Sequence, residues 1–222
     1  NELQLSWWPV IYGSSRVMTA PVNLSGINEV VVSFSHYLDN QINEYTLSIA
    51  TSTDGVNWNT AWSQSYGETG LYEVEQLIST PDMGNENVYF RIFYEGSSFT
   101  MNGWYFDNFQ ISTQDNLDIE LLSVDMTEML NYGSHDVRFT VQNTGSTTIE
   151  SVEATFKDFF NNDNIVTETF EVNIESLEKQ ELTFTEKAYL APGTYVMPIE
   201  IVSVNGTDDI NDGNNFIEKE IN

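Results

Sequence analysis

Short runs rich in β-branched and aromatic residues are the feature that most restricts the fold of this 222-residue chain. Turn-forming stretches such as STDGVNW and NDGNN separate these runs. We find no amphipathic pattern longer than two helical turns. Many short strands joined by polar turns predict an all-β chain built from antiparallel sandwiches. The clearest runs are EVVVSFSHY (29–37), EYTLSIATS (44–52), NVYFRIFYE (87–95), HDVRFTVQN (135–143) and GTYVMPIEIVSV (193–204).

The distribution of tryptophan and charge predicts two domains. All five tryptophans lie within residues 1–113, and the rest of the chain has none. The first part holds 12 acidic and 2 basic residues, whereas residues 114–222 hold 22 acidic and 5 basic ones. The polar stretch TQDNL separates the two compositions. We therefore expect one domain at 1–113 and a second at 118–222, joined by a short linker.

The charge and the cysteine content restrict the partners. A net charge of −27 disfavours nucleic acids and anionic membrane surfaces, which require clustered Lys and Arg. The charge is spread along the chain, so it predicts a solvated surface, or else an affinity for divalent cations or for neutral or cationic partners. Cysteine is absent, which excludes disulfides and thiolate metal sites. No apolar run approaches the length of a membrane span, so we expect no membrane insertion.

Asp107 is the first candidate site residue, because it interrupts an apolar pattern. Strict alternation places it on one strand face with Tyr105, Phe109 and Ile111. A carboxylate among core residues requires a bound metal or a basic partner. Arg16 and Arg91 are the basic residues available in the first domain. The residues leave three interpretations open: a cation ligand, an arginine pair, or an exposed residue that caps a turn.

Four stretches of the first domain occur in an order that is typical of one bacterial family. They are SRVMTAPVNLSG, VVVSFSHYLDN, STDGVNW and the closing WYFDN. Residues 2–112 thereby resemble the cleaved-adhesin or choice-of-anchor family, whose architecture is related to MAM domains. The resemblance implies a jelly-roll β-sandwich. It also implies a structural calcium ion bound by Asp107, with Glu2 and Asn108 contributing, although many relatives have a second aspartate where Asn108 stands.

The aromatic residues carry a separate signal. Exposed aromatic rings stack on sugars or anchor a protein partner, whereas buried ones fill a core. Both interpretations stay open for each ring. The candidate ligand-binding residues are Trp8, Tyr12, Trp62 and Tyr66.

Two further features of the first domain have structural interpretations. STDGVNW lacks the acidic twelfth residue of an EF-hand, and its Asp54–Gly55 pair favours a hairpin turn. His36 has no second histidine nearby in the sequence, since His135 belongs to the other domain. We therefore expect His36 to be a packed structural residue.

The second domain carries three motifs: VQNTGSTTIESVEATF, LAPGTYVMPIEI and the closing DINDGNNF. It resembles the bacterial cell-adhesion-related domain called CARDB, which implies an immunoglobulin-like β-sandwich of about seven strands. The acidic stretch DDINDGNNF is a possible calcium loop. We favour an Asx-rich hairpin, with Gly213 at positive φ and with Asn214 and Asn215 as structural turn residues.

The chain lacks the motifs of the common catalytic sites. There is no cysteine nucleophile, no G-x-S-x-G, no Walker loop and no H-E-x-x-H. A pair of carboxylates that acts on glycosides stays possible, because only their separation in space decides it. We expect no catalysis.

The two resemblances imply a broader role. They imply an adhesion or accessory and spacer region of a large secreted or cell-surface bacterial protein that has further domains. Its partner would be an extracellular glycan or protein. The alternative is a calcium-stabilised carbohydrate-binding module attached to a secreted hydrolase.

Overall fold

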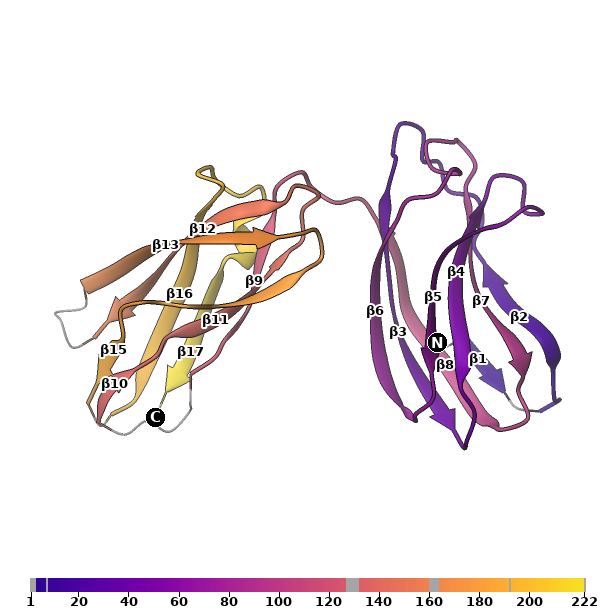
Figure 1. Ribbon diagram of the computed structural model, residues 1–222, viewed down its shortest axis with the longest axis horizontal. Helices are drawn as coiled ribbons and strands as arrows, with labels where there is room; N and C mark the ends of the chain where they lie inside the picture. The colour runs from indigo at the N-terminus through magenta and orange to yellow at the C-terminus, as the bar shows by residue number, and fades with distance from the viewer. Residues whose placement is uncertain (1–2, 7, 127–131, 160–163, 192, 222) are drawn as a thin grey trace. The chain divides into compact units, whose positions relative to one another are not determined.

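The computed structural model confirms the all-β prediction (Figure 1). It describes residues 3–6, 8–126, 132–159, 164–191 and 193–221. Within these ranges the regular structure consists of β-strands and a single 3₁₀ turn. The same ranges contain no helix long and apolar enough to cross a membrane. The chain divides into two compact units, residues 1–113 and residues 114–222.

The first unit contains two four-stranded antiparallel sheets, ordered β1-β8-β3-β6 and β2-β7-β4-β5. Early strands pair with late ones in a nested order: β1 with β8, β2 with β7, β3 with β6 and β4 with β5. This nested pairing is the jelly-roll arrangement that the sequence predicts. The strands are β1 (Leu3–Ser6), β2 (Tyr12–Met18), β3 (Val30–Asn40), β4 (Tyr45–Ser52), β5 (Asn59–Tyr66), β6 (Gly70–Ile78), β7 (Tyr89–Ser97) and β8 (Met101–Ser112).

The core of the first unit lies between its two sheets. Side chains alternate between the faces of a strand, so every second residue of β3, β4 and β7 points inward. Trp104 of β8 is the largest fully buried side chain. It packs with aliphatic and aromatic residues that include Phe34, Leu38, Leu47, Ile49 and Phe90.

The second unit is an immunoglobulin-like sandwich. One sheet has the order β14-β11-β9 and the other β13-β12-β16-β17, while the short pair β10-β15 continues β11 and β14. Its core is a separate cluster that includes Phe139 and Phe156. The strands are β9 (Ile119–Val124), β10 (Gly133–His135), β11 (Arg138–Asn143), β12 (Ile149–Asp158), β13 (Asn164–Ile174), β14 (Lys179–Thr183), β15 (Ala188–Leu190), β16 (Tyr195–Val204) and β17 (Phe216–Ile221).

The N-T-G turn of the second unit is fixed by a buried amide. The Asn143 Nδ2 donates to the backbone oxygens of Ile174, at 2.8 Å, and of Thr147, at 2.9 Å. Its Oδ1 accepts the backbone N–H of Gly145 at 3.0 Å. A Cβ on Gly145 would lie 2.6 Å from the backbone nitrogen of Asp118. The turn therefore requires both the asparagine and the glycine.

The closing motif of the second unit differs from the prediction at one residue. Asp212–Asn214 form the 3₁₀ turn, and Gly213 is not among the glycines with positive φ. The prediction for Gly213 is wrong because the 3₁₀ turn reverses the chain with ordinary right-handed angles. Asp209 does form an Asx-type contact, since its Oδ1 accepts the N–H of Asn211 at 3.3 Å.

Candidate ligand-binding face

Asp107 lies on the exposed side of β8, and the prediction that it faces the core is wrong. The β3–β8 register shifts between Ser33 and Ser35, so that β8 gains one residue at this point. Asn108 adopts a left-handed φ of 56° there. This bulge interrupts the strict alternation on which the prediction depended. Phe106, and not Asp107, packs against the core.

The Asp107 carboxylate stabilises the bulge itself. Its Oδ1 accepts the backbone N–H of Asn108 at 2.8 Å, and the Asn108 Nδ2 donates to the Ser35 Oγ at 3.2 Å. This is the turn-capping role that the sequence left open. An ion pair with Arg16 or Arg91 is excluded, because both arginines lie on the other sheet, on β2 and β7.

The described residues around Asp107 do not by themselves fit a calcium site. Calcium takes six to eight oxygen ligands, and this position supplies one carboxylate that is already engaged with a backbone N–H. Nowhere in the described ranges do three or more His, Asp or Glu side chains gather around a possible ion. Glu2, the other acidic ligand that the resemblance implies, lies outside the described residues. The calcium site therefore stays a prediction.

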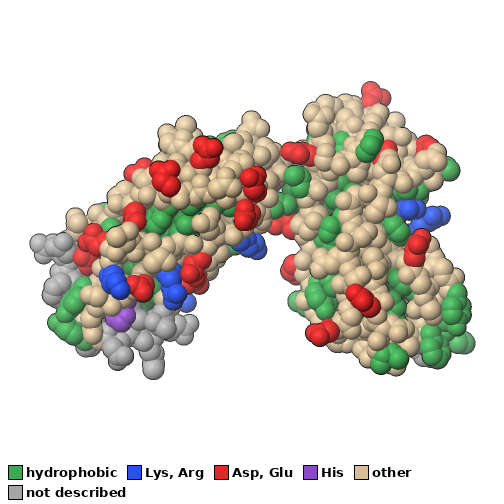
Figure 2. All heavy atoms as spheres, in the orientation of Figure 1, with side chains coloured by type: hydrophobic (Ala, Val, Ile, Leu, Met, Phe, Trp, Pro, Cys, Tyr) green, Lys and Arg blue, Asp and Glu red, His purple; other side chains and the backbone are tan. Residues whose placement is uncertain are grey.

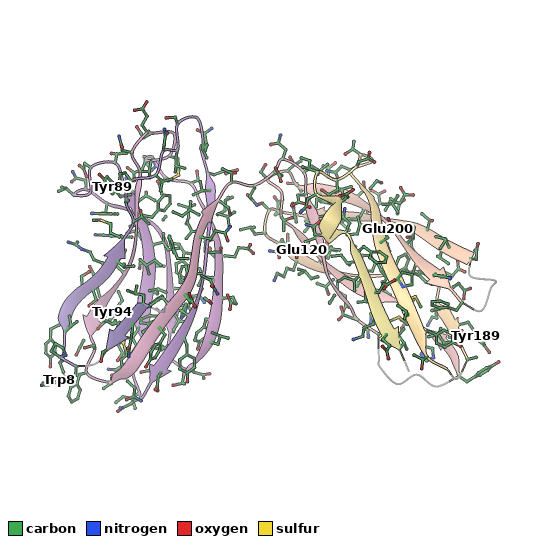
Figure 3. All side chains as sticks on the ribbon, turned by 180° about the vertical axis from the view of Figure 1, so that it is seen from behind. Trp8, Tyr89, Tyr94, Glu120, Tyr189 and Glu200 are labelled. Atoms are coloured by element: carbon green, nitrogen blue, oxygen red, sulfur yellow. The ribbon has the colours of Figure 1, made fainter. Side chains whose placement is uncertain are left out.

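The four candidate aromatic residues divide into two pairs. Trp8 and Tyr12 are 69% and 78% exposed, and Figure 3 shows the Trp8 ring at one end of the first unit, pointing away from the strands. Trp62 lies opposite the fully buried Ile49 and packs against the core. Tyr66 is only 5% exposed, so the expectation that it forms an exposed platform is wrong. Its strand position points inward, toward the core.

His36 is a buried structural residue, as the sequence predicts. The Trp104 Nε1–H donates to its Nδ1 at 3.0 Å. The Tyr66 ring meets it edge-on, with ring centroids 4.6 Å apart, and the Tyr72 ring stacks at 5.1 Å. Burial lowers the pKa of His36 to about 4. This neutral imidazole belongs to the aromatic core and is not available to a ligand.

The most distinctive surface of the first unit is the outer face of the sheet β2-β7-β4-β5. Phe90, Ile92 and Tyr94 of β7 point into the core, so the residues between them point outward. We call the four residues that gather here the arginine–aromatic face: Arg16, Trp58, Arg91 and Phe93.

Arg91 lies between two aromatic rings on this face. Its guanidinium carbon is 4.4 Å from the ring centroid of Trp58 and 4.3 Å from that of Phe93. Arg16 lies directly opposite Phe93 in the β2–β7 register, which makes it a diagonal neighbour of Arg91. These two cation–π contacts restrict the position of the Arg91 guanidinium.

The two arginines are the basic residues of the first unit, and they lie together. Figure 2 shows the blue of the basic side chains gathered at one place on the visible face of this unit. Burial, and then the charge of Arg16, lower the pKa of the Arg91 guanidinium, while Glu95 raises it. Within the described ranges neither arginine forms an ion pair, and the Arg91 Nε is buried without a hydrogen-bond partner.

A hairpin turn holds Trp58 over Arg91. Asp54 Oδ1 accepts the backbone N–H groups of Val56, at 2.8 Å, and Asn57, at 2.7 Å. Gly55 takes a φ of 71°. These contacts lower the pKa of the Asp54 carboxyl, the bond from Asn57 contributing most. The predicted hairpin at STDGVNW is therefore confirmed, and its contribution to the site is to position the tryptophan.

Hydroxyl groups and further rings border the arginine–aromatic face. Across β4 and β5, the Oγ atoms of Ser48 and Ser63 lie 2.8 Å apart. On β2, the exposed Tyr12 has the same strand parity as Arg16, so both point outward, and Tyr12 lies at the first residue of the strand. On β7, Tyr89 has the same parity as Arg91 and lies toward the other end (Figure 3).

Sequence reasoning missed this face, since it treated the arginines only as partners for Asp107. The signal was present in RIFYE, where an arginine, an aromatic residue and a glutamate occupy alternate positions of one strand. What the sequence does not contain is the cross-strand register, which brings Arg16 opposite Phe93. A stacked guanidinium keeps its N–H groups in one plane, and this geometry suits oxyanions and hydroxyl groups.

Comparisons with known proteins identify no family for this chain. No family model matches the chain, and no curated protein matches it. Similar solved structures include a GH2 β-galacturonidase from Eisenbergiella tayi, which is 10% identical to this chain. The match covers 94% of this chain and 35% of the enzyme, with a TM-score of 0.36. A putative β-galactosidase from Bacteroides fragilis is 12% identical, with 95% and 32% covered and a TM-score of 0.37.

The PBSX exported protein XepA is also similar, at 12% identity, with 92% of this chain and 82% of that one covered and a TM-score of 0.33. The chain spans about a third of the length of the two glycosidases. At such low identities and scores, these matches carry no conclusion about the function of this chain. No specific adhesion family is identified by these matches.

Proposed function

We propose that this chain is a non-catalytic binding region of a secreted or cell-surface bacterial protein with further domains. Residues 1–113 bind an extracellular glycan through the arginine–aromatic face, and residues 114–222 act as a spacer. The observation that supports this proposal is Arg91, whose guanidinium contacts the rings of both Trp58 and Phe93 and has no ion-pair partner among the described residues. The arrangement provides an ordered set of donors beside aromatic rings.

The chemistry of this face suits a sugar chain. A pyranose ring presents C–H groups on its faces, which pack on aromatic rings, and hydroxyl groups at its edge, which accept and donate hydrogen bonds. Trp58 is held by the Asp54 turn and Arg91 by two rings, so little side-chain entropy is lost when a ligand binds. The exposed Ser63, whose hydroxyl is hydrogen-bonded to that of the buried Ser48, adds a polar group on the same side of the sheet.

The second unit supports a spacer role through its charge and its core. It carries 22 acidic and 5 basic residues, which keep its surface solvated and self-repelling. Its buried cluster is independent of that of the first unit. In the alternative role, as a module attached to a hydrolase, the same face would bind the glycan and only the parent chain would differ.

Affinity electrophoresis tests the proposal. The full chain is run through gels that contain a panel of neutral and acidic polysaccharides, together with Trp58→Ala and, as a control, Tyr37→Ala. Tyr37 is 41% exposed but lies on β3, in the other sheet. We expect at least one polysaccharide to retard the unmodified chain and Tyr37→Ala, but not Trp58→Ala.

Two results would contradict the proposal. Retardation by no polysaccharide would remove the glycan as the ligand. Loss of retardation in Tyr37→Ala, with retention in Trp58→Ala, would move the site to the other sheet. Tryptophan fluorescence of each variant confirms that the first unit stays folded.

A further inference from the structure

The clustering of charge on the arginine–aromatic face says more about the ligand. The first unit has 12 acidic residues with which its two arginines could pair. Instead the arginines are diagonal neighbours on β2 and β7, and each repels the other. Within the described ranges neither guanidinium donates a hydrogen bond or forms an ion pair. Glu95 on the same face of β7 offers one carboxylate to two cations, so an excess positive charge remains for an anionic ligand to balance.

The geometry favours an oxyanion on that ligand. Arg91 contacts the Trp58 and Phe93 rings through its guanidinium, and a planar guanidinium binds a carboxylate through two parallel hydrogen bonds. Arg16, opposite Phe93, supplies a second cation beside the first. Stacking also weakens the hydration of the guanidinium, which lowers the cost of an anion replacing water.

Resting on the proposed function, we infer that the glycan is an acidic polysaccharide, whose oxyanions bind Arg16 and Arg91 while its sugar rings pack on Trp58. Uronate carboxylates and sulfate esters share this chemistry. Nucleic acids do not fit, because they require an extended basic surface and this one holds two cations. The chain as a whole has a net charge of −27 and repels polyanions. Retention on an acidic polysaccharide is therefore evidence of a specific site and not of ion exchange.

The test uses two pairs of polymers, and the members of each pair share one sugar backbone and differ in charge. Sodium polygalacturonate and its methyl ester differ in charge and share the sugar, and dextran sulfate and dextran form the corresponding sulfate pair. Titration calorimetry with the full chain compares each member of a pair. We expect the acidic member of at least one pair to bind about tenfold or more tightly than the neutral one, and the pair that responds identifies the oxyanion.

Variants connect the charge preference to the two arginines. Arg16→Gln and Arg91→Gln should each lose about tenfold in affinity for the acidic polymer and little for the neutral one. Arg138→Gln changes the net charge equally but lies on β11 of the second unit, and it should bind as the unmodified chain does. Trp58→Ala should weaken binding to both polymers. Arg16 lies between no rings, so its variant stays informative if Arg91→Gln unfolds.

The outcomes separate the inference from the proposed function. Equal affinity for charged and neutral polymers, with loss in Trp58→Ala alone, would overturn the acidic ligand and leave the glycan-binding proposal intact. Binding of poly-glutamate but of no polysaccharide would overturn both, since the partner would then be an acidic peptide. Absence of binding to every polymer would also overturn both.

Discussion

His36 gives the sharpest test of the structure, because its burial predicts a specific dependence of stability on pH. The imidazole is 1% exposed and accepts the Trp104 indole N–H at Nδ1. It is therefore neutral, with its proton on Nε2, and burial lowers its pKa from 6.5 to about 4. Burial also raises the pKa of Tyr66, whose ring contacts His36, to about 12, so this phenol stays neutral over the same interval.

The sign follows from linkage. Above pH 6.5 the imidazole is neutral in both the folded and the unfolded chain, so it imposes no penalty. As the pH falls from 6.5 to about 4, the unfolded chain binds a proton that the folded chain excludes. At 1.36 kcal/mol per pKa unit, the first unit loses about 3 kcal/mol of unfolding free energy over this interval.

The assay is urea unfolding followed by tryptophan fluorescence from pH 7 to pH 4. All five tryptophans lie within residues 1–113, so the signal reports the first unit. Protonation of carboxylates relieves repulsion over the same interval, and His36→Phe separates the two effects. This variant loses the acceptor of the Trp104 N–H at every pH, but it carries no titrating group. The unfolding free energy of the unmodified chain should fall relative to that of His36→Phe by about 3 kcal/mol.

His135→Gln is the matched control, because it removes the other histidine, which lies in the second unit. Its pH profile should parallel that of the unmodified chain. Parallel profiles for the unmodified chain and His36→Phe would refute the reasoning, since they would mean that the folded chain protonates His36 as readily as the unfolded one.

Three further predictions concern other residues. Burial, and to a smaller extent Asp209, raise the pKa of Asp118. Asp118→Asn should therefore raise the calorimetric unfolding midpoint of the second unit at pH 7, and this gain should shrink as the pH approaches 3.8. An equal gain at both pH values would contradict this. Gly145→Ala should lower the unfolding free energy of the second unit by about 1–3 kcal/mol, because its Cβ would lie 2.6 Å from a backbone nitrogen. Gly213→Ala is the control and should be close to neutral, because its Cβ would meet its nearest neighbour at 3.5 Å. Asp107→Ala should lower the stability of the first unit by about 1 kcal/mol through loss of the bulge contact. The calcium hypothesis further predicts that calcium raises the melting midpoint of the unmodified chain, that a chelator reverses this rise, and that the variant lacks it. A midpoint that responds to neither reagent would reject the calcium hypothesis.

The all-β sandwich class was accessible from the sequence, because strand signals depend on local pattern, whereas the jelly roll was implied by the family resemblance. Runs such as EVVVSFSHY bury alternate residues wherever they are placed, and the structure shows that run as β3. The role of His36 followed equally well from the absence of a second histidine nearby. The hairpin at Asp54 was predictable too, since an Asp-Gly pair between strands has few alternatives.

Asp107 shows where local pattern fails. The alternation rule holds only while both strands advance together, and the bulge at Asn108 adds one residue to β8. No feature of GWYFDNFQIS announces the bulge, because the shift arises in the pairing of β8 with β3 and not in β8 alone. Tyr66 fails for a related reason, as its burial depends on which face of β5 meets the core.

The sequence by itself determined the fold class, the boundary near Thr113 and the acidic character, since each follows from composition or from short-range alternation. Tertiary structure decided the candidate site. Arg16 and Arg91 are 75 positions apart in the chain, and only the antiparallel register of β2 with β7 makes them neighbours. Pairing between distant strands is set by the global packing of both sheets, so no local stretch of residues contains it.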